Sequence, residues 1–448
     1  MISSLSDHTP IELIYQDTAD IDPVDLSSGE QELKEYLGLV NKVMESGRYD
    51  EPESSINLSF DEGFKKSLLE RVKEEKNPGL KYIVVVGIGG SNLGTMALYQ
   101  ALRGMDVFMH DKDPKIIFID TVSPPLIAKA IGFLNNQINS PEEIIVNMIS
   151  KSGETTETVV NFEIVYETLK NKFGDKAHDR LVFTTDKGSK LWNIAESKNL
   201  KLLEIPQKVG GRYSVFSASG LFPLGLANFD IEGFWEGAAE MTKRCLRYET
   251  YENPALVSAV IAAHHYKNGI IINNNFFFNP ELKSVGKWYT QLMSESIGRE
   301  YNLKGEKVNI GITPVVSIGS TDLHSMAQLY LGGRKDKLTQ FIYASQKDIA
   351  PKVPIELFMP GLVEDIGGKS VADIMDAIFY GIKIAYIKNN LPFSEVVMHK
   401  ISENTLGQYM QLKMMETMYL ARLLGVNAFD QPKVEDYKRE TREILKKL

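Results

Sequence analysis

The sequence predicts an α/β protein with two three-layer α/β/α domains, each built on a parallel sheet. At 448 residues the chain is long enough for two cores, and 43% hydrophobic with 24% charged residues is ordinary for a globular protein. Short apolar runs alternate with helix-compatible segments over residues 81–228, and a second alternation covers 229–425. Because parallel strands need crossover connections, this alternation favours sheets with helices on both faces.

The expected strands are short and rich in β-branched residues. In the first domain they are Tyr82–Val86, Ile116–Ile119, Ile144–Ile149, Leu181–Thr184 and Leu202–Ile205. In the second they are Ile270–Asn273, Val315–Ile318, Gln340–Ala344 and Glu395–His399. Residues 1–80 are expected to form a helical arm, and residues 426–448 a C-terminal segment with a helix over Val434–Lys447.

Charge and cysteine content narrow the classes of partner. A formal net charge of -9 argues against nucleic acid or an anionic membrane surface as a general partner. The single cysteine, Cys245, excludes an intramolecular disulfide and favours a reducing compartment. The first residues lack a basic stretch followed by an apolar one, and no later segment reaches about 18 uninterrupted apolar residues. We therefore expect a cytoplasmic protein.

One glycine-rich turn stands out, within KYIVVVGIGGSNLGTMALYQAL over residues 81–102. The turn follows the apolar run Tyr82–Val86, and its glycines allow the backbone to approach a ligand closely. Ser91 and Asn92 offer N-cap side chains to a helix over Leu93–Leu102. Backbone N–H groups at a helix start favour an anion, so the turn predicts an anion site that includes Gly90 and Ser91.

Residue spacing separates the possible anions. A dinucleotide fingerprint needs a third glycine at the position of Asn92, although Asp120 at the end of the second strand could hold a ribose. A Walker A loop needs Lys and Ser/Thr where Thr95 and Met96 stand. A small phosphate monoester remains the favoured ligand. A glycine turn that only packs helix against strand stays open as the alternative.

A second cluster of hydroxyl groups follows the strand Ile144–Ile149, in the sequence SKSGETTET. Ser150, Ser152 and Thr155 crowd the turn, and Lys151 adds a positive charge. A single cluster of this kind is commonly only a helix cap. Since the carboxyl ends of parallel strands share one edge of the sheet, both clusters together predict a phosphate site there.

Further along the chain, two residues could carry chemistry. Gly211 belongs to a glycine pair that lets backbone approach a substrate, and Arg212 could stabilise a developing negative charge, unless it is a surface arginine in a turn. Glu295 falls in the last turn before Gly298, where a carboxylate opposes the helix dipole, so it is a candidate base. No pattern of metal-ligating spacing is present, so we expect no metal site.

In order along the chain, these motifs resemble those of the phosphoglucose isomerases in their short, bacterial-type form. The resemblance covers most of residues 80–440 and is carried by GIGGSNLG, SKSGETTET, VGGRYSVFSASGLFPLG, QLMSESIG, and the pair formed by the His324 segment with FDQPKVEDYK. It implies two sugar-isomerase (SIS) domains, a homodimer without metal or organic cofactor, and interconversion of glucose 6-phosphate and fructose 6-phosphate through ring opening and a cis-enediolate.

The resemblance also implies residue roles. Glu295 matches the proton-transfer base and Arg212 the arginine that stabilises the intermediate, whereas His324 matches a ring-opening histidine supplied by the partner subunit. Lys438 matches an assisting lysine, which places the C-terminal helix on the active site. The substrate and phosphate residues would be Gly90, Ser91, Ser150, Lys151, Ser152, Thr155, Gly211, Gln291 and Gln431. Arg299 departs from the pattern, because the family usually has lysine there.

Two other functions remain open at this point. A non-catalytic regulator that binds sugar phosphates could keep the fold and the pocket, but it would not need a placed base, so Glu295 and Lys438 discriminate. Asp120 gives slight support to an NAD-dependent oxidoreductase, and the missing third glycine argues against this function.

Overall fold

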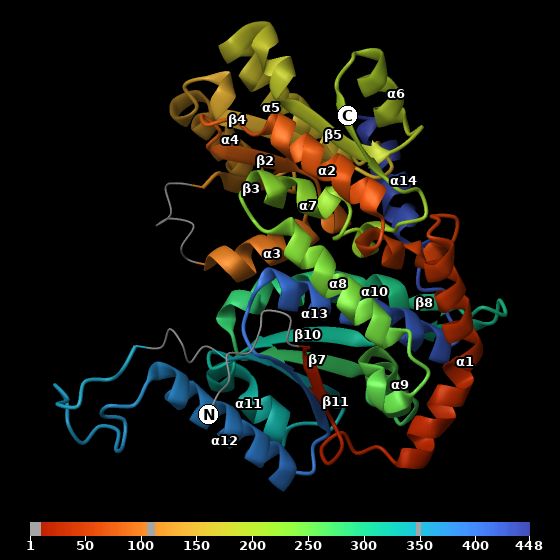
Figure 1. The fold of residues 1–448 in the computed structure, drawn as a ribbon, viewed down its shortest axis with the longest axis vertical. Coiled ribbons are helices and arrows are strands. Elements are labelled where there is room, and N and C mark those ends of the chain that lie inside the picture. Colours follow the sequence, from red (N-terminus) through yellow and green to blue (C-terminus); the bar gives the residue numbers. More distant parts are fainter. Residues whose placement is uncertain (1–9, 105–112, 346–350) are drawn as a thin grey trace.

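The computed structural model of the chain describes residues 10–104, 113–345 and 351–448. Two sheets lie towards opposite ends of an elongated molecule, and the long helices α8 (Ile231–Cys245), α10 (Lys283–Ile297) and α13 (Glu403–Leu423) lie between them (Figure 1). Each sheet has helices on both faces. The predicted fold class is therefore confirmed, whereas the exact domain bounds at residues 80, 228 and 425 stay a prediction.

The first sheet has five parallel strands in the order β3-β2-β4-β5-β6. All five coincide with predicted strands, at β2 Tyr82–Val86, β3 Lys115–Ile119, β4 Ile144–Ile149, β5 Leu181–Asp186 and β6 Lys201–Ile205. The helices of this part are α3 Leu93–Arg103, α4 Pro124–Gln137, α5 Thr156–Phe173, α6 Lys190–Ser197 and α7 Ala218–Leu226.

The central strand β2 shows why the sequence folds this way. Successive side chains of a strand point to opposite faces. Ile83 and Val85 join the core that includes α3 and α7, whereas Val84 and Val86 join the core under α4 and α5. A strand buried on both faces favours apolar residues along its whole length, which is why a continuous run of β-branched residues predicted it.

The second sheet has the order β1-β12-β11-β7-β10. Its parallel strands are β7 Ile272–Phe277, β10 Thr313–Ile318, β11 Lys337–Ala344 and β12 Phe393–Met398. The helices α9 (Pro254–Lys267), α10 and α13 share one core with this sheet. On its other face, α11 (Leu323–Gly332) and α12 (Val371–Lys388) pack on an aromatic cluster that includes Phe276, Phe278 and Phe341.

All four parallel strands of this sheet differ from their predicted bounds, by up to four residues, and β7 differs most. Strand β7 continues to Phe277, and Asn273, Asn274 and Asn275 are buried within it. Because these residues are polar, a prediction based on apolar runs ended the strand too early. Strand β12 begins at Phe393 and ends at Met398.

The N-terminal residues are more integrated than the predicted arm. Strand β1 (Glu12–Ile14) pairs antiparallel with β12 and forms an edge of the second sheet. Helix α1 (Pro23–Ser46) packs against α9 and α13, and α2 (Glu62–Glu75) packs against α7. The described part of this segment therefore contacts both halves of the molecule. Strand β1 went unpredicted because three residues carry too little periodicity.

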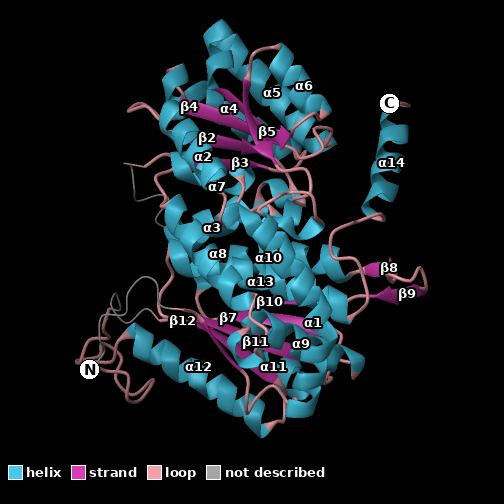
Figure 2. Ribbon diagram, turned by 45° about the vertical axis from the view of Figure 1, so that its right-hand side comes forward, coloured by secondary structure: helices cyan, strands magenta, loops and turns pink. Residues whose placement is uncertain are grey.

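The C-terminal helix α14 (Val434–Leu445) has no buried residue and stands clear of the body (Figure 2). The expected packing of this helix on the active site is thus not seen in the described chain. Its charged side chains pair largely along the helix, as Lys438 does with Glu435 at 2.8 Å. None of the described helices is both long and apolar enough to cross a membrane.

Candidate active site

The two turns predicted to bind phosphate lie side by side at the carboxyl edge of the first sheet. Val86 pairs with Met148 in the parallel register of β2 and β4, so both strands end at the same level. A Cβ added to Gly87 would lie 3.0 Å from the carbonyl oxygen of Ile149 and 3.0 Å from the Cβ of Ser91. The structure therefore brings the Ser91 turn and the Ser150 turn together.

The turn that contains Gly89, Gly90 and Ser91 approaches the turn Gly211–Tyr213 so closely that only glycine fits at position 90. A Cβ on Gly90 would lie 2.3 Å from the carbonyl carbon of Gly211. Gly89 has φ of 61°, and a Cβ there would lie 2.9 Å from Nε2 of Gln291. The glycines thus serve to join three segments that are distant in sequence.

The expected N-cap bond in this turn is absent. Asn92 occupies the N-cap position of α3, but its side chain accepts no backbone N–H there. The side-chain nitrogen instead lies 3.4 Å from Oδ2 of Asp120, at the end of β3. Backbone N–H groups at the start of α3 therefore have no side-chain cap from Asn92.

The second turn is ordered by its own hydroxyl groups. Oγ of Ser150 lies 3.0 Å from Oγ1 of Thr155, and the N–H of Gly153 donates to Ser150 Oγ at 3.1 Å. Gly153 has φ of 72°, in the left-handed region. Ser152 is exposed at the tip of the turn. Thr155 is the N-cap residue of α5 by position, yet its side chain forms no cap bond.

Positive charge gathers around this edge. Burial lowers the pKa of Lys151, Asp186 acts in the opposite direction, and Arg212 and Lys208 lower it further. Burial also raises the pKa of Asp186 to about 6, although Lys151 opposes that shift. Lys151, with Arg212 and Lys208 near enough to lower its pKa, gives this edge a positive charge that suits an anionic ligand, in a protein whose net charge is negative.

Asp186→Asn is expected to flatten the dependence of stability on pH between about 4 and about 6. Since the folded-state pKa of Asp186 is raised, its contribution to stability is complete below the unfolded pKa and is lost as the pH rises through about 6. The side chain is only half-buried, so solvent screening limits the effect to on the order of 1 kcal/mol. Urea unfolding near pH 4.5 and near pH 7.5 measures it. Equal pH profiles for wild type and variant would contradict the assignment.

Arg212 is buried and held by five acceptor contacts. It is 4% exposed, which excludes the alternative of a surface arginine. Its Nε donates to Ser296 Oγ at 2.8 Å, and Nη2 donates to the carbonyls of Ala428 and Asp430 at 2.5 and 3.1 Å. The remaining nitrogen, Nη1, faces Gln431 Oε1 at 3.1 Å. The guanidinium is thereby fixed in one orientation.

Nη1 of Arg212 also lies 3.3 Å from Oε2 of Glu295, in the last turn of α10. The other carboxylate oxygen of Glu295 accepts from Gln291 Nε2 at 3.0 Å. The Glu295 side chain is 28% exposed, so a ligand can still reach it. Oε1 of Gln291 is buried without a partner among the described residues, which leaves an acceptor for a hydroxyl group.

The structure adds residues that sequence reasoning missed. Ser296 is fully buried and receives Arg212 Nε, and its hydroxyl lies 2.9 Å from the Tyr213 hydroxyl. The backbone carbonyls of Ala428 and Asp430 hold the arginine from the C-terminal segment. The only signal for Ser296 was its place beside Glu295. Backbone acceptors leave no signal in the sequence.

Two residues that were predicted to be catalytic do not contact Arg212 or Glu295 in the described chain. His324 is exposed at the start of α11, on the face of the second sheet that α12 also covers. Lys438 lies on α14 and pairs with Glu435. Gln431, by contrast, reaches the site because the chain passes Arg212 before α14 begins.

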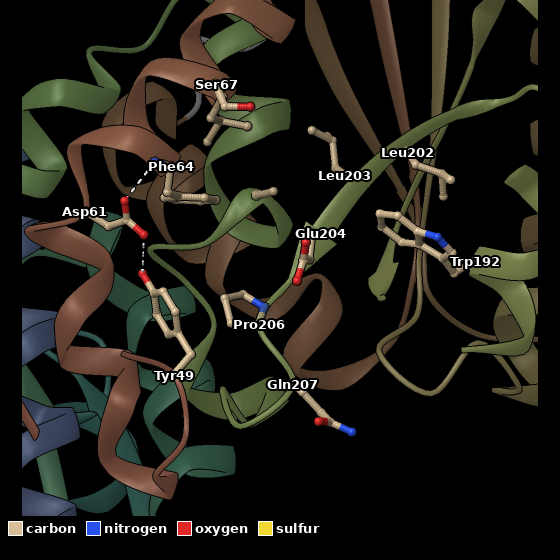
Figure 3. A pocket seen from close by; sticks show the side chains of 12 residues that line it. Tyr49, Asp61, Phe64, Ser67, Trp192, Leu202, Leu203, Glu204, Pro206 and Gln207 are labelled. Atoms are coloured by element: carbon tan, nitrogen blue, oxygen red, sulfur yellow. Dashed lines mark hydrogen bonds between the residues drawn. The ribbon is translucent and has the colours of Figure 1, made fainter. Parts of the chain in front are cut away.

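A separate cavity of about 590 Å³ lies between α2 and the edge strand β6 (Figure 3). Figure 3 shows Asp61 accepting a hydrogen bond from the Tyr49 hydroxyl on one side, with Trp192 on the far side of β6. None of the predicted site residues lines this cavity. The candidate active site is therefore defined by the Arg212–Glu295 contact and the two turns, not by this cavity.

Comparison with solved structures supports the same fold. A hypothetical protein from Thermus thermophilus matches with a TM-score of 0.80 and 27% identity, over 97% of this chain and 99% of that one. A glucose-6-phosphate isomerase from Chlamydia trachomatis matches with a TM-score of 0.79 at 21% identity, over 97% of this chain and 88% of that one, which speaks for the fold alone.

Sequence comparison shows the family. A glucose-6-phosphate isomerase from Carboxydothermus hydrogenoformans is 33% identical over 383 residues, which are 84% of this chain and 81% of the relative. One from Methanocaldococcus jannaschii is 34% identical over 375 residues, or 82% and 85% of the two chains. The family model described as phosphoglucose isomerase matches residues 66–448. The chain belongs to the phosphoglucose isomerase family.

Proposed function

We propose that this protein interconverts glucose 6-phosphate and fructose 6-phosphate in the cytoplasm, without metal or organic cofactor. The observation that carries the proposal is the contact between Glu295 and the buried guanidinium of Arg212, beside two anion-suited turns. Its membership of the phosphoglucose isomerase family and its relatives named glucose-6-phosphate isomerase agree with this chemistry.

The reaction needs a base that serves two neighbouring carbons. Once the sugar ring is open, Glu295 removes a proton from one carbon and returns it to the other through an enediolate. Arg212 stabilises the negative charge that develops on the enediolate oxygen, because its orientation is fixed before the reaction. The turns at Ser91 and Ser150 hold the remote phosphate and thereby position the reacting carbons.

A coupled assay tests the activity directly. Purified protein is incubated with fructose 6-phosphate, and the glucose 6-phosphate that forms is detected with an NADP-dependent dehydrogenase. Turnover is expected, and it should persist after exhaustive chelation. Binding of the sugar phosphate without turnover would favour the regulator instead. The regulator is disfavoured because it has no need of the Glu295–Arg212 contact.

We further propose a homodimer in which His324 acts in the partner's site. In one chain His324 is exposed, and no hydrogen bond or ion pair among the described residues joins it to Arg212 or Glu295. Segment 351–370, which precedes α12, projects from the end of the molecule that also carries α11 and the second sheet (Figure 1). This segment and α12 expose large apolar side chains, at Ile355, Phe358, Met359, Leu362, Val363, Tyr380, Ile384 and Ile387. Such a patch suits a second copy of the chain.

Complementation is expected to show whether His324 acts across the interface. Glu295→Gln and His324→Ala dimers are each inactive or nearly so, and then they are dissociated and reassembled together. If His324 serves the partner, one site in each mixed dimer is intact, and activity returns to roughly a quarter of the wild-type value. If His324 acts in its own chain, every site keeps one defect and no activity returns. Reassembly of each variant alone is the control.

A further inference from the structure

Arg299 is a second buried arginine beside the site, and the reaction scheme does not use it. It follows Gly298 at the end of α10, begins strand β8 (Arg299–Tyr301), and is 9% exposed. Its Nη1 donates to the carbonyls of Glu295 and Gly298 at 2.6 and 2.7 Å. One edge of its guanidinium is therefore attached to the turn of α10 that carries the base.

The other edge of Arg299 is attached to the C-terminal segment. Nε donates to the Asn427 carbonyl at 2.7 Å and lies 3.1 Å from the carboxylate of Asp430, while Nη2 donates to the Asp430 carbonyl at 2.5 Å. Arg212 donates to the same Asp430 carbonyl. Two buried cations thus share one backbone acceptor, and displacing the segment would leave Nη2 of each arginine without its acceptors.

The attachment continues one residue further along β8. Glu300 pairs with Lys433 at 2.6 Å, just before α14 begins. Arg299 and Glu300 therefore hold the segment 427–433 at two points, on either side of Gln431. Since Gln431 contacts Arg212, the position of this segment sets how Arg212 faces Glu295.

A lysine could not replace these contacts. An ammonium group is a compact point charge with three donors, whereas the guanidinium is a planar fork with five. Only the fork can reach acceptors on α10 and on the segment 427–430 at the same time. The arginine, in a place where the sequence pattern leads one to expect lysine, is therefore not a conservative replacement.

We propose that Arg299 is a positioning residue, which holds segment 427–431 against the end of α10 and so maintains the geometry of Arg212 and Gln431 towards Glu295. Its printed contacts are all with protein groups, so its proposed role is to position the site and not to bind substrate. The proposal rests on the proposed isomerase function for its kinetic consequence, but the contact itself does not depend on that function.

Arg299→Met is expected to lower kcat about 10- to 100-fold while KM stays within about threefold, because a small misplacement of Arg212 weakens only the transition state. Arg299→Lys should recover part of the loss. Arg180→Met is the matched control, since Arg180 is half-buried and donates to the Ile144 carbonyl at the opposite end of β4. Its thermal stability should fall without a change in kcat. An Arg299→Met enzyme with wild-type kcat would overturn the proposal.

Amide hydrogen exchange gives a readout that does not need turnover. Arg299→Met should speed exchange across 427–433 and the last turn of α10, and Arg180→Met should not. Unchanged exchange in these two segments contradicts the proposal, whatever the activity. If the wild-type protein fails to isomerise fructose 6-phosphate, the proposed function is wrong, and exchange still decides the role of Arg299. If Arg299→Met does not fold, Arg299→Lys serves in both measurements.

Discussion

Glu295→Gln is expected to lower kcat by about 10² to 10⁴-fold and to leave the affinity for fructose 6-phosphate largely intact. The amide cannot accept a proton from carbon, so the transfer between the two carbons loses its carrier. The substitution keeps the volume of the side chain and its contact with Gln291. The turns proposed to bind phosphate, at Ser91 and Ser150, follow β2 and β4 and not α10, so they should keep their geometry.

Stopped assays of kcat, together with calorimetric titration of the sugar phosphate, separate the two effects. Glu143→Gln is the matched control, because Glu143 also pairs with a cation, Lys81 at 2.6 Å, and is mostly buried. It precedes β4 at the end of the sheet remote from the site. The control should keep wild-type kcat. Near-normal turnover in Glu295→Gln would show that another residue is the base.

The sequence was most informative where each residue serves a single local requirement. Strand β2 was predictable because its residues, buried on both faces, form an unbroken apolar run, and the glycines after it because close contacts there exclude a Cβ. Glu295 could be singled out because a carboxylate in the last turn of a helix is unfavourable without a purpose.

Contacts between distant segments were much less predictable. Arg212 had the sequence context of a surface turn, and its burial depends on carbonyls more than 200 residues away. Strand β1 has too few residues to show a two-residue period. Strand β7 contains three consecutive asparagines, which interrupt the apolar run that would have predicted it. For His324 and Lys438, only the family resemblance assigned a role, and the described chain leaves both outside the Arg212–Glu295 group.

Of two substitutions at Arg212, Arg212→Lys tests the role of the guanidinium more directly, because it keeps the positive charge and removes the planar group with five donors. Arg212→Met should lower kcat by about 10² to 10³-fold, the usual cost of losing a donor to a developing oxyanion. Arg212→Lys should lose nearly as much. One ammonium group cannot bond Ser296 and both backbone carbonyls while also facing Glu295.

Both Arg212 variants should also be less stable, since each buried carbonyl left without a donor costs about 1–3 kcal/mol. Activity is therefore compared well below the unfolding midpoint of each variant, measured by calorimetry. Arg244→Lys is the control, because Arg244 also donates to a distant carbonyl, that of Ile11 at 2.8 Å, far from the site. If Arg212→Lys keeps wild-type kcat, charge alone suffices at this position. The fixed orientation of the guanidinium would then have no part in stabilising the enediolate.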